Sequence, residues 1–160
     1  MSASPAEPRF RPATADDLPA IVRLLADDPL GAGRETVADP LPAAYREAFD
    51  AIARDPNQAL VVVGLPDRPV AGVLQITYTP YLTHRGGWRA TIEGVRIAAD
   101  LRSEGLGRRL FEWAIAQARA RGCRMVQLTS DKARPDAIRF YESLGFRASH
   151  EGLKLPLSGP

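Results

Sequence analysis

Apolar positions recur along the chain with two different spacings, and these spacings predict a mixture of strands and helices. A short strand over Arg9–Pro12 is followed by a hydroxyl and acidic cap at 14–17 and by apolar residues at helical spacing up to Leu25. A second amphipathic helix is predicted over Ala43–Arg54, after a loop at 27–42 that is rich in Asp, Gly and Pro. The first third of the chain is therefore predicted to contain one strand and two helices.

The rest of the chain begins with strand patterns and then alternates strands with helices. Leu60–Val63, Val70–Thr79 and Ala90–Ile97 are predicted to form a three-stranded meander. A long amphipathic helix is predicted from Gly105 to Arg121, because its apolar residues share one face. The remaining predicted elements are a strand over Met125–Thr129, a helix over Pro135–Leu144, and two short closing strands over Phe146–Ala148 and Leu153–Leu155. This order predicts an α+β fold in three layers, with helices on both faces of the sheet.

Composition and charge narrow the class of protein. A chain of 160 residues that is 45% hydrophobic and 25% charged fits one globular domain, which we expect over 9–157 after a disordered tail at 1–8. The 21 Lys and Arg nearly balance the 19 Asp and Glu, which argues against a nucleic-acid-binding module.

The lack of visible targeting signals and the single cysteine bear on the compartment of the protein and on metal binding. No apolar run is long enough to span a bilayer, and no signal peptide is visible. The single cysteine, Cys123, excludes an intramolecular disulfide and a cysteine metal cluster. We therefore expect a cytoplasmic protein without a membrane partner and without a bound metal.

The segment that bears most on function joins the third meander strand to the long helix. It reads Arg102-Ser103-Glu104-Gly105-Leu106-Gly107-Arg108. A helix N-terminus offers unpaired N–H groups and a partial positive charge, and glycines let the backbone approach an anion closely. The segment is therefore either an anion site or a tight turn with solvated arginines. It lacks the Gly-Lys-Ser/Thr of a P-loop, and Leu110 replaces the third glycine of a dinucleotide fingerprint.

A second motif, Ala137-Ile138-Arg139-Phe140-Tyr141-Glu142-Ser143-Leu144-Gly145-Phe146, follows one strand later. The two motifs, together with the opening at 10–13, resemble the GNAT superfamily of N-acetyltransferases over about residues 9–155. The resemblance implies a mixed, mostly antiparallel sheet that is splayed in the middle. It also implies acetyl-CoA as the co-substrate and direct transfer of the acetyl group to a primary amine.

The same resemblance assigns residues to the cofactor. The pyrophosphate loop falls on 102–108, and the strand that bears Val95 and Ile97 pairs with the pantetheine arm. Arg134 stands where the family often has an asparagine, so only a contact from its guanidinium to a phosphate is expected there. The expected cofactor-binding residues are Val95, Arg96, Ile97, Arg102, Ser103, Glu104, Gly105, Leu106, Gly107, Arg108 and Arg134.

Two residues are the leading catalytic candidates. Tyr141 matches the family's tyrosine that often protonates the departing thiolate. Without the resemblance, the sequence alone favours a half-buried packing tyrosine at this position. An amine acceptor is protonated at neutral pH, so a base must take its proton. Glu93 is the best base candidate, because strand parity places it on one face with Val95 and Ile97. A surface position or an ion pair with a neighbouring arginine is the alternative for Glu93, and His84 and His150 compete for the role of base.

The acceptor is expected to be a small-molecule or peptide amine. We expect its pocket to be built from the loop at 27–42, the loop at 78–88 and the closing strands. Its acidic groups are expected from Asp27, Asp28, Glu35 and Asp39, and its aromatic walls from Tyr78, Tyr81 and Trp88. A homodimer is left open. A catalytically idle CoA-binding sensor or interaction module is the alternative to the enzyme.

Overall fold

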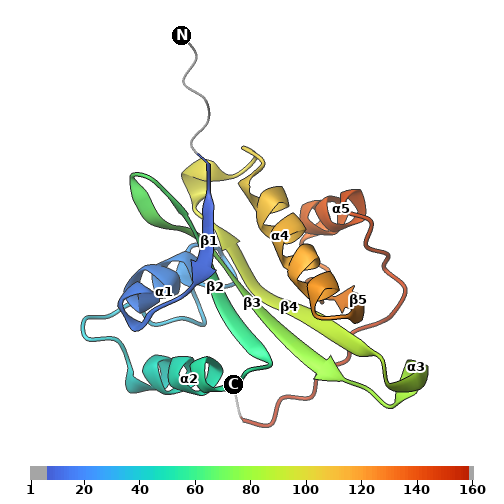
Figure 1. Cartoon of the computed structure of the whole chain (residues 1–160). Helices are drawn as coiled ribbons and strands as arrows, with labels where there is room; N and C mark the ends of the chain where they lie inside the picture. Colours follow the sequence, from blue (N-terminus) through green and yellow to red (C-terminus); the bar gives the residue numbers. More distant parts are fainter. Residues whose placement is uncertain (1–6, 159–160) are drawn as a thin grey trace.

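A five-stranded sheet runs through the centre of the structure, a computed structural model that describes residues 7–158 (Figure 1). Its strands are β1 (Arg9–Pro12), β2 (Gln58–Leu65), β3 (Arg68–Pro80), β4 (Trp88–Ile97) and β5 (Cys123–Gln127). They lie side by side in chain order. Every neighbouring pair is antiparallel except β4 and β5, which are parallel. The predicted mixed, mostly antiparallel sheet is therefore confirmed.

Helices cover both faces of this sheet, as predicted. One face carries α1 (Leu18–Ala26) and α2 (Ala43–Arg54), and the other carries α4 (Leu106–Ala120), with α5 (Pro135–Ser143) beside it (Figure 1). The short α3 (Thr83–Gly86) forms the turn between β3 and β4, and two 3₁₀ turns, η1 (Ala15–Asp17) and η2 (Ala99–Leu101), precede α1 and α4.

The predicted cap at 14–17 is formed. The backbone N–H of Thr14 donates to Asp17 Oδ2 at 2.7 Å, and Arg11 Nη1 donates to the same oxygen at 2.7 Å. These bonds hold the pKa of Asp17 at about 2, chiefly through the Arg11 contact. The start of α1 is thereby tied to β1.

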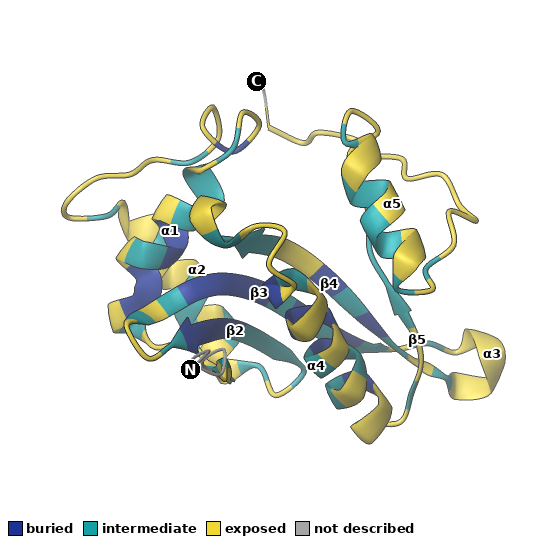
Figure 2. Cartoon of the chain, turned by 90° about the horizontal axis from the view of Figure 1, so that it is seen from above, coloured by how far each residue is buried: buried dark blue, intermediate teal, exposed yellow. Residues whose placement is uncertain are grey.

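The larger core lies between the sheet and α4. Leu110, Phe111 and Ala114 of α4 are almost fully buried and pack on Leu74 and Ile76 of β3. A smaller core on the other face joins Ile21 of α1 to Val62 and Val73. Figure 2 shows the buried residues concentrated in the central strands and in the helix faces turned toward them. The sheet is thus covered on both sides, as its apolar strands require.

The β4 strand contains a bulge at Gly94. Val73 of β3 pairs with Arg96, but Gln75 pairs with Glu93, so two residues of β4 oppose one residue of β3. Gly94 has a φ of +61°, the left-handed conformation that glycine adopts without steric penalty. Because a strand alternates its side chains, the extra residue reverses the face on which every later side chain lies.

The two closing strands predicted over 146–148 and 153–155 do not form. In the described chain, the residues after α5 contain no strand, although Phe146 packs against Phe111 with ring centroids 6.2 Å apart. Leu153 and Leu155 are 93% and 83% exposed. A strand needs a paired ladder and an apolar face to cover, and this segment has neither within residues 7–158. The prediction of two closing strands was therefore wrong.

Candidate active site

A cleft of about 310 Å³ opens between β4, α4 and α5. Its lining combines apolar side chains with arginines: Asp28, Val95, Arg96, Ile97, Arg102, Gly107, Phe111, Arg134, Phe140 and Tyr141. Seven of the residues expected from the sequence to bind cofactor or act in catalysis are therefore brought together here. They come from four separate stretches of the chain.

The cleft exists because β4 and β5 separate halfway along. Their parallel ladder runs from Trp88 to Thr91 of β4 and stops at Gln127 of β5. Beyond it, residues 92–97 of β4 keep β3 as a partner but have no β5 beside them. The carbonyl of Val95 accepts from Arg96 Nη1 at 2.8 Å, and that of Ile97 accepts from Arg102 Nε at 3.1 Å. The splay implied by the resemblance is thus present at the predicted strand.

The glycines at the start of α4 have different surroundings. Gly105 caps the helix with a φ of +83°, and a Cβ placed there would meet nothing within 4 Å. At Gly107 the Cβ would lie 3.7 Å from Ile97 Cγ1 and 3.8 Å from Phe140 Cζ, at the wall of the cleft. Gly107 therefore borders the cleft itself, whereas Gly105 serves the turn into the helix.

The other residues of the predicted pyrophosphate loop do not line the cleft. Ser103 and Glu104 are exposed in the turn before α4, and Leu106 is buried in the core. Arg108 is exposed and donates to Ser143 Oγ at 2.8 Å. The loop thus presents backbone and arginine groups at the mouth of the cleft, where the first-turn N–H groups of α4 have no carbonyl partner within the helix.

A half-buried residue, Asp28, joins two arginines of the cleft through its carboxylate. Arg134 Nη2 donates to its Oδ1 at 2.8 Å, and Arg96 Nε lies 2.7 Å from its Oδ2 in an ion pair without a well-directed hydrogen bond. Burial alone would raise the pKa of Asp28. The backbone N–H groups of Gly31 and Leu30 and the two guanidinium charges outweigh it, so the pKa lies below its ordinary value. Asp28 therefore stays charged and fixes both arginines.

Tyr141 stands in the cleft among aromatic rings. Its ring centroid lies 5.4 Å from that of Phe111 and 5.5 Å from that of Phe140. Burial raises the pKa of the phenol, and the charges of Arg96 and Arg134 partly oppose this rise. The phenol is therefore neutral at physiological pH, which is the form that donates a proton.

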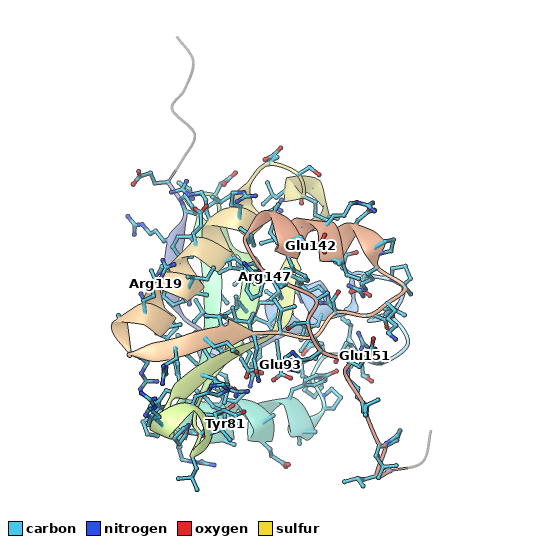
Figure 3. The ribbon with its side chains drawn as sticks, turned by 90° about the vertical axis from the view of Figure 1, so that its right-hand side faces the viewer. Tyr81, Glu93, Arg119, Glu142, Arg147 and Glu151 are labelled. Carbon is cyan, nitrogen blue, oxygen red and sulfur yellow. The ribbon has the colours of Figure 1, made fainter. Side chains whose placement is uncertain are left out.

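Glu93 lies on the face opposite to the one predicted. Ala90 and Ile92 before the bulge, and Val95 and Ile97 after it, all face α4. Glu93 pairs with Gln75, so it faces the side of α1 and α2 and is exposed. In the view of Figure 3, the labelled Glu93 lies below α5 and above α2. The parity argument failed because the bulge at Gly94 reverses the alternation.

The competing histidines and the predicted aromatic wall lie away from the cleft. His84 and His150 are both exposed, and neither lines it. Tyr78 is 7% exposed and packs in the α4 core beneath the Arg121 guanidinium, which corrects its place in the acceptor wall. Tyr81 and Trp88 lie at the end of β4 opposite to the splay.

Sequence reasoning missed two features of the site. The bulge had a visible signal, because an isolated glycine inside a strand pattern often marks one. Asp28 was expected to attract a cationic amine, but its carboxylate pairs with Arg96 and Arg134 instead. That pairing had no signal in the sequence, since the two arginines are 68 and 106 positions away in the chain. Such a contact is created only by the tertiary fold.

Comparison with known proteins agrees with this geometry. The family model described as "Acetyltransferase (GNAT) family" matches residues 18–146. The chain therefore belongs to the GNAT family and is an N-acetyltransferase, of a class whose members take the acetyl group from acetyl-CoA.

Three relatives illustrate the range of the family. An aminoalkylphosphonate N-acetyltransferase of Salmonella typhimurium is 29% identical over 107 residues, covering 67% of this chain and 68% of the relative. A glucosamine 6-phosphate N-acetyltransferase of Trypanosoma brucei brucei is 33% identical over 92 residues, covering 58% and 60%. The crystal structure of a Bacillus halodurans C-125 protein described as a transcriptional regulator is 52% identical, with a TM-score of 0.90, and covers 94% of this chain and 100% of that one.

Within residues 7–158, no helix is both long and apolar enough to cross a bilayer. The same residues hold no cluster of three or more His, Cys, Asp or Glu side chains arranged to bind a metal ion.

Proposed function

We propose that this N-acetyltransferase binds acetyl-CoA in the cleft between β4, α4 and α5 and transfers the acetyl group directly to a small primary amine. The observation that carries the proposal is the free half of β4, which lies beside Tyr141 in a cleft rimmed by arginines. The apolar wall of Val95, Ile97 and Phe140 suits the pantetheine arm. The arginines and the N-terminus of α4 suit the phosphates.

The chemistry is divided between the two faces of the sheet. Bound acetyl-CoA supplies a thioester, and when the amine nitrogen bonds to the carbonyl carbon the carbon–sulfur bond breaks and a thiolate leaves. Tyr141 holds a proton on its phenolic oxygen and gives it to that sulfur. Glu93, on the other face, takes the proton of the amine directly or through one water. Its exposure on that face supports this role, because an acceptor can reach it from solvent.

The acceptor that we propose is a small primary amine bearing a phosphoryl or phosphonyl group. The names of both curated relatives describe acceptors that combine an amine with a phosphorus oxyanion. The arginines of the cleft outnumber the carboxylates that pair with them, because Arg96 and Arg134 share Asp28 and Arg102 pairs with Asp27. The remaining positive charge favours the phosphates of acetyl-CoA and the oxyanion of such an acceptor alike.

A panel of matched amines tests this proposal by thiol release from acetyl-CoA. We expect turnover with 2-aminoethylphosphonate or glucosamine 6-phosphate, and a kcat/KM at least about tenfold lower with ethylamine or glucosamine, because a charge-assisted contact is lost. Equal turnover of the amines with and without the oxyanion would contradict a role for the oxyanion in acceptor binding. Absence of turnover with every amine would contradict the enzymatic role.

A second function has one observation in its favour. The 52% identical structure is described as a transcriptional regulator, which fits a CoA-binding sensor. Such a sensor would bind acetyl-CoA in calorimetry and release no thiol with any acceptor. The half-buried, protonated Tyr141 favours the enzyme, because a sensor has no need of a proton donor in the cleft.

A further inference from the structure

Three polar side chains form a row on the sheet face that carries α1 and α2. Asp55 follows the last residue of α2, Gln58 is the first residue of β2, and Gln75 lies within β3. Gln58 Nε2 donates to Asp55 Oδ2 at 3.0 Å, and Gln75 Nε2 donates to Gln58 Oε1 at 3.1 Å. We call these three residues the amide chain. The amide chain leads from the end of α2 across β2 and β3 toward β4.

The direction of the amide chain is fixed at Asp55. An ionised carboxylate only accepts hydrogen bonds, whereas an amide has a donor side and an acceptor side. The bonds from Gln58 and from the backbone N–H of Asn57 lower the pKa of Asp55, so this residue is ionised at neutral pH. Gln58 therefore turns its NH₂ group to Asp55 and its carbonyl oxygen to Gln75. Gln75 in turn must direct its NH₂ group to Gln58.

The amide chain ends in an oxygen beside Glu93. Gln75 lies directly opposite Glu93 of β4, and such a pair projects from one face with Cβ atoms about 4.5–5.5 Å apart. Within residues 7–158, Gln75 Oε1 accepts no hydrogen bond, since the bond of this side chain is made by its nitrogen. Gln75 is half-buried and Glu93 is exposed. An amide oxygen and a carboxylate are thus presented together on a surface that solvent reaches.

We infer that Gln75 Oε1 and the carboxylate of Glu93 together bind the amino group of the acceptor, and that Asp55 is the positioning residue that directs this oxygen through Gln58. An alkylammonium group has three N–H donors and no acceptor, so it fits two oxygens and is repelled by an NH₂ group. The inference rests on the proposed function, because it assigns the amino end of the same acceptor.

The oxyanion end of that acceptor has a partner on the same face. Val73 lies two residues before Gln75 in β3 and pairs with Arg96, which Asp28 holds in an ion pair. Two residues of a strand span about 6–7 Å. The amine and the oxyanion therefore have separate partners at a spacing that suits an acceptor with only a few bonds between the two groups.

Gln75→Leu tests the amide oxygen, with 2-aminoethylphosphonate and ethylamine as acceptors. The KM of both amines should rise by about 10–100-fold, because a hydrogen bond to a charged group is lost. The kcat should be retained, since the oxygen accepts from the ammonium and from the neutral amine alike. Gln117→Leu is the matched control, because it removes the same amide from α4 on the other face of the sheet.

Asp55→Asn tests the positioning role without a change of size. Asp55 Oδ1 accepts from the backbone N–H of Asn57 at 2.8 Å, and this bond keeps an oxygen at that place in the variant. The new NH₂ group then faces Gln58, so both glutamines reverse and Gln75 presents its NH₂ group to the amine. The KM should rise by about the same factor as in Gln75→Leu. Asp50→Asn is the control, because Asp50 lies on α2 in an exposed ion pair with Arg46.

A rescue separates this role from a structural one. In the double variant Asp55→Asn, Gln75→Glu, the carboxylate introduced at position 75 accepts from the reversed Gln58 and offers its other oxygen to the amine. The KM should return to the wild-type value or below it. In the Gln75→Leu background, Asp55→Asn should have no further effect on KM. Failure of the rescue, or additive effects of the two single variants, would overturn the positioning role of Asp55.

Binding without chemistry distinguishes this inference from the proposed transfer. 2-Aminoethylphosphonate is titrated into the protein saturated with CoA, and the side-chain amide signal of Gln75, identified by its loss in Gln75→Leu, should shift. An unshifted signal, or an unchanged KM in Gln75→Leu, would overturn the inference and leave the transfer standing if the wild type turns over an amine. A shifted signal without turnover of any amine would support the binding pair and contradict the transfer.

Discussion

The two halves of β4 belong to one strand but have different neighbours. Residues 88–91 are paired on both edges, by β3 and by β5, so they form an interior part of the sheet. Residues 92–97 have only β3, and their free edge borders the cleft with Tyr141. The first half therefore contributes to stability, and the second half leaves a free edge at the proposed binding cleft. The bulge at Gly94 lies at the start of the second half and reverses the faces of the side chains there.

The largest effect that we expect at the second half is the loss of the Tyr141 hydroxyl. Tyr141→Phe keeps the aromatic packing, so kcat should fall by about 10²–10⁴-fold while the affinity for acetyl-CoA measured by calorimetry barely changes. Tyr45→Phe is the matched control, because Tyr45 lies on α2 and its hydroxyl bonds to Glu35 and Thr36 in the loop before that helix. An equal loss of rate and affinity would mark Tyr141 as a binding residue.

The pH profile offers a second measurement on the same residue. Activity needs the protonated phenol, so it is present at lower pH and is lost as the pH rises through the pKa of Tyr141. Because burial raises that pKa above the ordinary value of 10.0, the alkaline limb due to this group should lie above 10.0. The limb should disappear in Tyr141→Phe. A limb that persists unchanged would belong to another group.

The next effect tests the face opposite to the cleft. Glu93→Gln is nearly isosteric and removes the proton acceptor, so kcat/KM should fall by about 10²-fold, the low end for general base catalysis, because Glu93 is exposed. The acidic limb of the pH profile should shift or vanish. Glu112→Gln, on the exposed side of α4, should behave as the wild type. A rise in KM with kcat retained would instead mean that Glu93 only positions the ammonium group.

A smaller effect concerns the wall of the cleft at Gly107. Gly107→Val places methyl groups beyond a Cβ that already lies 3.7 Å from Ile97 Cγ1, so they should occupy the space assigned to acetyl-CoA. We expect the dissociation constant for acetyl-CoA to rise by about 5–100-fold, the range of overpacking by a few methyl groups. Gly107→Ala is the control, because its single Cβ makes only ordinary contacts. Unchanged affinity in Gly107→Val would place acetyl-CoA elsewhere.

The sequence predicted the sheet and its long helix better than it predicted the cleft. The long helix ending near Arg121 and the meander strands have strong periodic patterns, and both lie within two or three residues of their predicted bounds. Their apolar faces decide their place, so pattern and structure agree. The two sequence motifs also identified residues of the cleft, because each motif is a short continuous segment of the chain. Strand parity beyond Gly94 and the ion pairs of Asp28 depend on a local bulge and on distant contacts, which a spacing rule does not contain.

The smallest effect tests whether the bulge itself separates the two halves of β4. Gly94 has a φ of +61°, and a Cβ there would meet only Leu25 Cδ2, at 4.0 Å. Gly94→Ala should therefore destabilise the fold through backbone strain alone, by about 1–2 kcal/mol. That corresponds to a fall in Tm of about 2–8 °C for a chain of this length.

Gly33→Ala is the control for this variant, because its φ is not in the left-handed region and a Cβ there meets nothing within 4 Å. If the strain is relieved by closing the bulge, Glu93 and Arg96 can no longer both lie on the face of α1. The kcat/KM of Gly94→Ala should then fall more than its stability explains. Wild-type kinetics together with a lowered Tm would show that alanine accepts the bulged conformation. The bulged backbone, and not the glycine itself, would then set the geometry that the reaction requires.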